Sequence, residues 1–192
     1  VLAMPSALIT GVGRPNGIAV AIVRLLAADG WKLGIHHFDE DPSDVLAGIA
    51  SAVAGVQHED LGDPAAPARL FDGLQPAAGP FDALIIVHTR CVPADLLATS
   101  AEEMDRHWAV NVRAALLMIQ EFARRLKAPT GRIIAFTSDH FTPANLAYGS
   151  TKAALDRVVL AAAHELGAQG IRANAINPGP TDTGWMTPEI YS

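Results

Sequence analysis

The sequence has little cysteine and no excess of positive charge. Cys91 is the only cysteine among 192 residues, which excludes an internal disulfide framework and leads us to expect a reducing, cytoplasmic location. Lysine and arginine together number 14 against 20 aspartates and glutamates, giving a formal net charge of -6, and the basic residues form no cluster. Such a surface would repel a phosphate backbone, so nucleic acid is not an expected partner.

Long apolar runs, a leader-like start and metal-ligand patterns are missing as well. No apolar run approaches the roughly 18 residues that span a bilayer, so we expect no membrane association. Residues 1–5 lack the charged-then-apolar layout of a secretory signal. The 7 histidines show no ligand spacing with a carboxylate, so no metal site is predicted. With 50% hydrophobic residues, the chain can still build one sizeable core.

Short apolar runs alternate with helix-like stretches from one end of the chain to the other. The runs are nearly continuous in hydrophobicity, as strands are when helices cover both faces of a sheet. The predicted strands are Ala7–Thr10, Lys32–His36, Val53–Gln57, Ala83–Val87, Arg132–Thr137 and Arg172–Ile176. Repetition of strand and helix predicts an α/β fold: a doubly wound, Rossmann-type parallel sheet in the order 3-2-1-4-5-6, forming a single domain over residues 1–192.

Four helices are marked by residues that begin or end helices. The first should end at Gly30, and its predicted apolar face consists of Ile18, Ile22, Leu25 and Leu26. Asp63 followed by Pro64 predicts the start of another helix. Residues 100–103 form a capping box that begins a long helix to about residue 127. The last helix is expected from about residue 144 to 167.

A glycine-rich turn joins the first predicted strand to the first helix. Glycines let the backbone approach a ligand closely, and the helix N-terminus aims free N–H groups and the positive end of its dipole at that ligand. Glycines also serve simply to make a tight turn. At the carboxyl end of the first strand, such a turn is where a dinucleotide pyrophosphate binds. The predicted contacts are Gly11, Gly13, Arg14, Asn16, Gly17 and Ile18.

Tyr148 and Lys152 stand four residues apart at the start of the last helix, on one of its faces. A nearby ammonium favours the phenolate, which would lower the tyrosine pKa from about 10 toward the range useful for acid–base catalysis. Ser138 ends a strand at the same sheet edge, where its hydroxyl could donate to a carbonyl oxygen that gains negative charge. The same residues are also consistent with a simpler interpretation, in which Tyr148 and Lys152 form an exposed surface pair and Ser138 merely ends a strand.

Together these features resemble the short-chain dehydrogenase/reductase family of the Tyr-x-x-x-Lys type, and members similar to 3-oxoacyl-acyl-carrier-protein reductases look most alike. The resemblance covers essentially the whole chain and includes the turn at 10–11 and segments 60–61, 110–112, 131–138 and 177–179. It implies an NAD(P)-dependent oxidoreductase that transfers a hydride between nicotinamide and a carbonyl or secondary alcohol. It also implies a homodimer or homotetramer.

The resemblance assigns roles to individual residues. Tyr148 would be the proton donor or base, Lys152 would lower its pKa and hold the nicotinamide ribose, and Ser138 would orient the carbonyl. Asn111 would hold a water that links Lys152 to solvent, unless its amide simply bonds neighbouring backbone. Asp60 would meet the adenine, or simply cap a turn. The cofactor contacts implied besides the glycine turn are His37, Asp60, Leu61, Val110, Tyr148, Lys152, Pro178, Gly179, Thr181 and Thr183.

The sequence also departs from the family pattern. The usual Asn-Asn-Ala-Gly segment reads Ile-Val-His-Thr at 86–89, which removes an asparagine that braces the sheet beside the cofactor. His88 is then either a substrate-facing group or a packed histidine bonded to backbone. The lengthened glycine turn is reminiscent of the enoyl-reductase branch, but Leu155 stands where that wider tyrosine–lysine spacing requires lysine. Family members usually continue beyond Gly179, so we expect this sequence to lack a C-terminal segment.

The choice of cofactor and substrate rests on fewer residues. The second strand ends without an acidic side chain at the usual place, and Arg14 can pair with a 2′-phosphate or be an exposed loop charge, so the sequence leans towards NADP(H) over NAD(H). The predicted wall suits an apolar carbonyl of acyl, polyketide or steroid-like type. Its candidates are Arg90, Phe141, Leu146 and Trp185, with Cys91, Val92 and Met186 beside them.

Two other functions compete with that of an oxidoreductase. Asp139 and His140 beside Ser138 do not suggest a hydrolase triad, because they are sequence neighbours and no Gly-x-Ser-x-Gly elbow surrounds the serine. The second hypothesis is a binding or regulatory protein that kept the fold but lost efficient cofactor use, and it rests on the altered segment 86–89 and the unusual glycine turn. The joint presence of the four groups with catalytic roles favours the enzyme.

Overall fold

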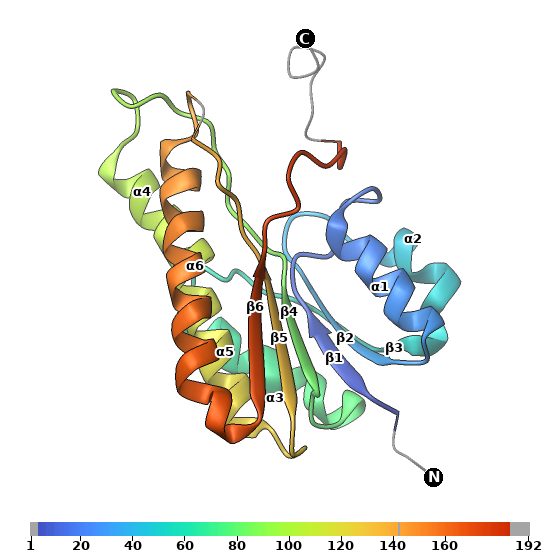
Figure 1. Ribbon diagram of the computed structural model, residues 1–192. Coiled ribbons are helices and arrows are strands. Elements are labelled where there is room, and N and C mark those ends of the chain that lie inside the picture. Colours follow the sequence, from blue (N-terminus) through green and yellow to red (C-terminus); the bar gives the residue numbers. More distant parts are fainter. Residues whose placement is uncertain (1–3, 142, 185–192) are drawn as a thin grey trace.

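The computed structural model describes residues 4–141 and 143–184 and contains a six-stranded parallel sheet (Figure 1). The strands are β1 (Ser6–Ile9), β2 (Lys32–His37), β3 (Val53–His58), β4 (Ala83–Ile86), β5 (Gly131–Phe136) and β6 (Ile171–Ile176). They lie in the order β3-β2-β1-β4-β5-β6, and each neighbouring pair is parallel. The predicted Rossmann-type order is confirmed.

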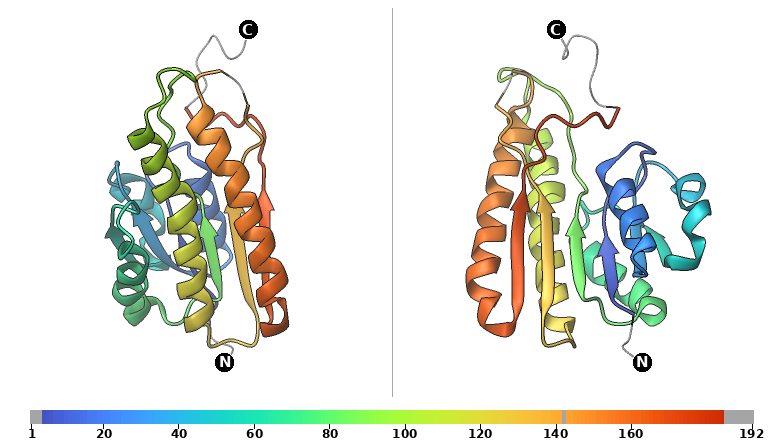
Figure 2. Two further views of the ribbon diagram at one scale, coloured as in Figure 1. Left: turned by 90° about the vertical axis from the view of Figure 1, so that its left-hand side faces the viewer. Right: turned by 45° about the vertical axis from the view of Figure 1, so that its right-hand side comes forward.

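Helices cover both faces of this sheet, as Figure 2 shows. They are α1 (Ile18–Ala28), α2 (Ser43–Leu46), α3 (Ala66–Ala78), α4 (Ala101–Trp108), α5 (Ala114–Arg125) and α6 (Leu146–Leu166). Alternate residues of one strand enter two separate cores: Ala7 and Ile9 of β1 pack with α1, whereas Leu8 packs with α3, α5 and α6. Because both faces are buried, the strands read as continuous apolar runs.

Helices α3 and α1 differ from their sequence predictions. Helix α3 begins at Ala66, because the Asp63 carboxylate accepts a hydrogen bond from the Ala65 N–H at 2.9 Å and closes a separate turn before the helix. Pro67, not Pro64, therefore occupies the first helical turn. The buried face of α1 is also rotated from the predicted one. It consists of Ala19, Val20 and Val23, while Leu25 is 63% exposed.

The capping box at the start of α4 is confirmed, since the Ser100 hydroxyl accepts the Glu103 N–H at 3.1 Å. The predicted single helix, however, is divided by a π-helical turn over Ala109–Arg113 and ends at Arg125. A π turn inserts one extra residue and changes the direction in which side chains point. None of the helices in the described part of the chain has the length and apolar character that a bilayer crossing requires.

Candidate active site

The carboxyl ends of the strands bring the start of α6 and the glycine turn to one edge of the sheet (Figure 1). Tyr148 and Lys152 lie on consecutive turns of α6, and the Lys152 Nζ lies 5.8 Å from the centroid of the Tyr148 ring. The predicted shared face therefore brings the phenol and the ammonium together.

The Lys152 ammonium is buried against the end of β5. Its Nζ donates a hydrogen bond to the Phe136 carbonyl oxygen at 2.7 Å, and the residue is only 3% exposed. Burial disfavours the charged form and lowers the lysine pKa from 10.5 to about 8. The group is therefore mostly protonated at neutral pH, but it releases its proton far more readily than an exposed lysine.

The Tyr148 phenol responds to two opposing effects. Burial raises its pKa, and a hydrogen bond with the Ser138 side chain lowers it by a smaller amount. The net shift is upward, whereas the sequence predicts a downward shift caused by Lys152. The prediction was wrong because desolvation outweighs the other effects, and Lys152 directs a donor to the Phe136 carbonyl.

His140 supports both Ser138 and Tyr148, a role that sequence analysis missed. Its backbone N–H donates to the Ser138 Oγ at 3.2 Å, and its ring packs edge-on against the Tyr148 ring with centroids 6.0 Å apart. Its carbonyl oxygen would lie 2.3 Å from a Cβ placed at Gly149. The short connection from Ser138 to Tyr148 was the available signal, because it forces this loop to turn back onto α6.

A side chain at Gly149 should disturb this arrangement. In Gly149→Ala, the new methyl group displaces the His140 carbonyl, so we expect kcat to fall about tenfold and the unfolding free energy to fall by about 1–3 kcal/mol. The KM for dinucleotide should change little. Gly48→Ala is the matched control, because its Cβ meets nothing within 4 Å. Steady-state kinetics and urea unfolding that show equal effects for both variants would contradict this account.

Asn111 lies in the π turn with its side chain fully engaged. Its Nδ2 donates to the Arg90 carbonyl and to the Thr151 Oγ1, each at 2.9 Å, and its Oδ1 accepts the Arg90 N–H at 2.6 Å. The simpler interpretation, an amide bonded to neighbouring backbone, therefore describes the side chain. The amide ties the loop after β4 to α6, which carries Tyr148.

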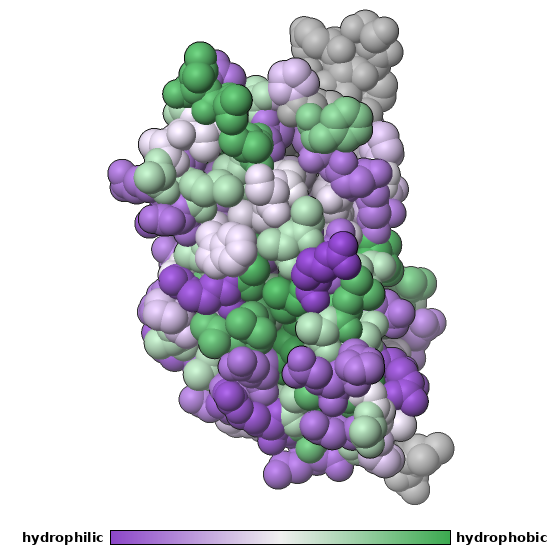
Figure 3. All heavy atoms as spheres, turned by 60° about the vertical axis from the view of Figure 1, so that its left-hand side comes forward, coloured by the Kyte–Doolittle hydropathy of each residue, from purple (hydrophilic) through white to green (hydrophobic). Residues whose placement is uncertain are grey.

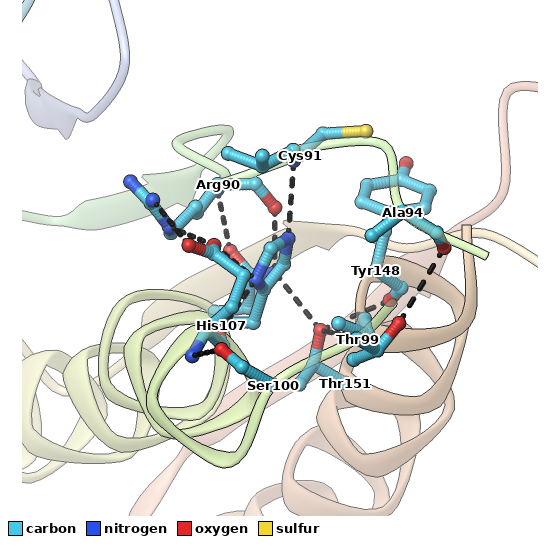
Figure 4. Close-up of polar contacts among 12 residues, drawn as sticks. Arg90, Cys91, Ala94, Thr99, Ser100, His107, Tyr148 and Thr151 are labelled. Carbon is cyan, nitrogen blue, oxygen red and sulfur yellow. Dashed lines mark hydrogen bonds and ion pairs between the residues drawn. The ribbon is translucent and has the colours of Figure 1, made fainter. Parts of the chain in front are cut away.

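The predicted substrate wall is only partly assembled. The Arg90 guanidinium points away from Tyr148 and forms a two-point ion pair with Glu103 at 2.7 and 2.9 Å (Figure 4), so it does not contribute to the wall. Cys91 faces the tyrosine side of the loop and donates its thiol to Asn145. Phe141 and Leu146, two other predicted wall residues, have exposed side chains. The predicted wall residues Trp185 and Met186 lie outside the described residues.

Comparison with known proteins agrees with this geometry. A family model described as enoyl-(acyl carrier protein) reductase matches residues 11–190. An uncharacterised oxidoreductase of Bacillus subtilis is 35% identical over 195 residues, covering 96% of this chain and 78% of that protein. A short-chain dehydrogenase from Burkholderia cenocepacia, solved with NADP, is 32% identical with a TM-score of 0.85, covering 93% of this chain and 75% of that one. The chain belongs to the short-chain dehydrogenase/reductase family.

Other members of the family are similar over most of this chain. A carbonyl reductase of Sus scrofa, named for NADPH, is 31% identical over 180 residues and covers 90% of this chain and 70% of that protein. Although the matching family model carries the enoyl-reductase description, Leu155 is buried in the core at the position where that branch would require its lysine. The tyrosine–lysine spacing here is thus that of the Tyr-x-x-x-Lys members.

The glycine turn has the features that this family's dinucleotide requires. Gly11 adopts φ +75, which favours glycine, and Gly17 caps α1 without a side chain that could occupy the helix N–H groups. Beside the turn lies a hollow of about 460 Å³. Its lining residues are Arg14, Pro15, Asn16, Glu40, Thr183 and Gly184. The hollow thus joins the glycine turn to the segment after β6, and its residues fit a dinucleotide.

Other predicted cofactor contacts already take part in the fold through hydrogen bonds or packing. The Asp60 Oδ1 accepts the Gly62 N–H at 2.8 Å, which is the turn cap given as its simpler interpretation. Leu61 is packed in the core between the sheet and α3, so only its backbone could meet a ligand. The Val110 carbonyl accepts a hydrogen bond from His88, and a His37 ring nitrogen donates to the Glu40 carbonyl.

The segment after β6 is exposed, and hydrogen bonds between its own residues form a turn in it. Gly179, at φ +66, follows Pro178 and donates its N–H to the Asn177 side chain at 3.0 Å, and the Thr181 hydroxyl donates to the Gly179 carbonyl. This turn leads the chain to Thr183 at the hollow. In the described ranges, no three His, Cys, Asp or Glu side chains meet in a way that could hold a metal ion.

Proposed function

We propose that this chain uses NADP(H) to interconvert a carbonyl compound and its secondary alcohol, with Tyr148 as the acid–base group and with cofactor and catalytic residues in the single domain 1–192. As a member of its family, the chain is an NAD(P)-dependent oxidoreductase. The observation that carries the proposal is the meeting of Ser138, Tyr148 and Lys152 at the sheet edge where the glycine turn also lies.

Each of these residues has a defined task. Ser138 accepts the His140 N–H, so its own hydroxyl proton remains free to be donated to Tyr148 or to a substrate carbonyl oxygen. Tyr148 gives its proton to that oxygen in reduction or removes it in oxidation. When bound, the nicotinamide supplies or accepts the hydride. The phenol of Tyr148 is protonated at neutral pH, as reduction requires, and burial raises its pKa further above the ordinary value of about 10.

Lys152 and Asn111 support proton delivery. Lys152 uses one donor on the Phe136 carbonyl, so its two other N–H groups can serve the nicotinamide ribose. Because the Asn111 amide is already engaged, we propose that its main-chain carbonyl holds the water that links Lys152 to solvent. The loop after β4 keeps this part of the π turn in place.

The cofactor preference is proposed to depend on Arg14. Arg14 lines the hollow, and its guanidinium can pair with a 2′-phosphate. Glu40 lines the same hollow and would repel this phosphate, so the preference for NADPH should be modest. Arg14→Ala should raise the KM for NADPH about tenfold and leave that for NADH nearly unchanged. Arg24→Ala, on the exposed side of α1, is the control. A lower KM for NADH than for NADPH in the unmodified protein would contradict the preference.

The substrate is proposed to be an apolar carbonyl compound, including 3-oxoacyl derivatives. Leu97 and Phe141 on loops, and Leu146 at the start of α6, present exposed apolar side chains. The proposed function is tested by following the nicotinamide absorbance of NADPH with aliphatic, aromatic and 3-oxoacyl carbonyl compounds. Saturable oxidation with apolar ketones supports it. Saturable NADPH binding with no turnover of any compound would favour the binding-protein hypothesis.

Self-association in the cytoplasm is proposed through α4, α5 and α6. Figure 3 shows apolar side chains gathered on the face that α5 and α6 form, and Trp108, Leu116 and Leu160 on these helices are exposed. Sedimentation should therefore give a dimer or tetramer, and Leu160→Glu should shift it toward monomer because it places charge in the contact. A monomer at micromolar concentration in the unmodified protein would contradict this proposal.

A further inference from the structure

His36 lies directly beneath the glycine turn, at the end of β2. Its Nδ1 accepts the Gly11 N–H at 3.2 Å, while its Nε2–H donates to the Glu59 carbonyl at 3.0 Å. The His36 carbonyl also accepts the Val12 N–H at 3.0 Å. The residue is 1% exposed, so one buried imidazole joins the turn to the end of β3.

His88 holds the other side of the turn. Its Nδ1 accepts the Thr10 hydroxyl at 2.7 Å, and its Nε2–H donates to the Val110 carbonyl at 3.1 Å. A Cβ at Gly11 would lie 2.7 Å from the backbone of His88, so the turn rests directly on this residue. The packed histidine given as one interpretation of this position is therefore what the structure contains.

The His36 and His88 rings pack against each other beneath the glycine turn. Their ring centroids are 6.3 Å apart at an interplanar angle of 84°. Each ring needs one unprotonated nitrogen as an acceptor and one N–H as a donor, so both hydrogen-bond pairs require neutral histidine. Burial lowers the pKa of His36 to about 4 and that of His88 to about 3, which keeps both rings neutral at physiological pH.

We infer that His36 and His88 are positioning residues for the dinucleotide, which brace the glycine turn in a chain whose segment 86–89 lacks the asparagine that would brace the sheet beside the cofactor. Hydrogen bonds run from Glu59 through His36 to Gly11, and from Thr10 through His88 to Val110. The turn that would receive the pyrophosphate is thereby tied to the π turn that carries Asn111. The inference rests on the proposed function.

The test is dinucleotide affinity, measured by NADPH fluorescence titration of the full chain. His88→Leu removes both hydrogen bonds, so we expect the Kd for NADPH to rise about tenfold, with kcat at saturating NADPH and the KM for carbonyl nearly unchanged. His88→Gln keeps an N–H that can reach the Val110 carbonyl and should restore most of the affinity. The corresponding pair at the Gly11 N–H is His36→Phe, which removes the hydrogen-bond acceptor, and His36→Gln, which retains a polar side chain that can accept. His164→Leu, exposed on α6, is the control.

The outcomes separate this inference from the proposed function. Absence of saturable NADPH binding by the unmodified protein would refute the proposed function, and the inference with it. Binding by the unmodified protein together with equal affinity in His88→Leu would overturn the inference alone. Equal losses in His88→Leu and His88→Gln would also overturn it, because ring volume rather than hydrogen bonding would then matter. If His88→Leu does not fold, His88→Asn, too short to reach Val110, replaces it in the same comparison.

Discussion

Tyr148→Phe is expected to lower kcat by about three orders of magnitude and to leave the Kd for NADPH within about twofold of the unmodified value. The ring remains and keeps its packing against His140 and its position near Lys152. What is lost is the hydroxyl bonded to Ser138, which is the only group proposed to exchange a proton with the substrate oxygen. Carbonyl-dependent NADPH oxidation and fluorescence titration measure the two quantities.

The control for this variant lies on the same helix. Ser150→Ala removes a hydroxyl that donates to the carbonyl of Leu146, one turn earlier, and should change neither quantity appreciably. Residual turnover above about a tenth of the unmodified rate in Tyr148→Phe would mean that another group donates the proton. The assigned role of Tyr148 would then be wrong.

Lys152→Met is expected to damage turnover and dinucleotide affinity together while stabilising the protein without ligand. Loss of charged hydrogen bonds to the ribose should raise the Kd for NADPH tenfold or more, and kcat should fall by about two orders of magnitude. The buried ammonium opposes folding, since a pKa lowered from 10.5 to about 8 corresponds to about 3 kcal/mol. Replacing it with a long apolar side chain should recover part of that free energy.

The pH dependence gives this prediction a definite sign. Between pH 8 and 10.5 the unfolded chain retains a proton that the folded state has released, so the unfolding free energy rises with pH in this window. Below about pH 8 both states are protonated, and the full penalty remains. Thermal unfolding between about pH 8 and 10 should show this rise as a difference between the unmodified protein and Lys152→Met, because burial raises the pKa values of Cys91 and Tyr148 in both proteins and their opposing contributions cancel. Lys127→Met, exposed after α5, should keep the rise. A profile in Lys152→Met as steep as in the unmodified protein would contradict it.

Much of the fold follows from local pattern in the sequence. Repeated short apolar strands and helices predict the parallel order, because right-handed crossovers leave few alternatives. The spacing of Tyr148 and Lys152 places them on one helix face wherever the helix lies. Ser138 reaches the same edge because parallel strands end together. These predictions depend on short-range geometry, which composition and spacing define well.

The rest depends on contacts between distant segments. A π turn adds one residue without changing the apolar pattern of the flanking helices, so the direction of Asn111 could not be read from spacing. Arg90 is directed by Glu103 on another element, not by its own loop. The pKa of Tyr148 depends on burial, which competes with charge and hydrogen bonding only once the tertiary structure exists.

The most direct test of the central claim is deuterium transfer. NADPH deuterated at its transferable hydrogen is mixed with an apolar ketone, and the alcohol formed is analysed by mass spectrometry. The account predicts one deuterium on the former carbonyl carbon with the unmodified protein, and only traces of product with Tyr148→Phe. An alcohol without deuterium, or the same yield from both proteins, would contradict it.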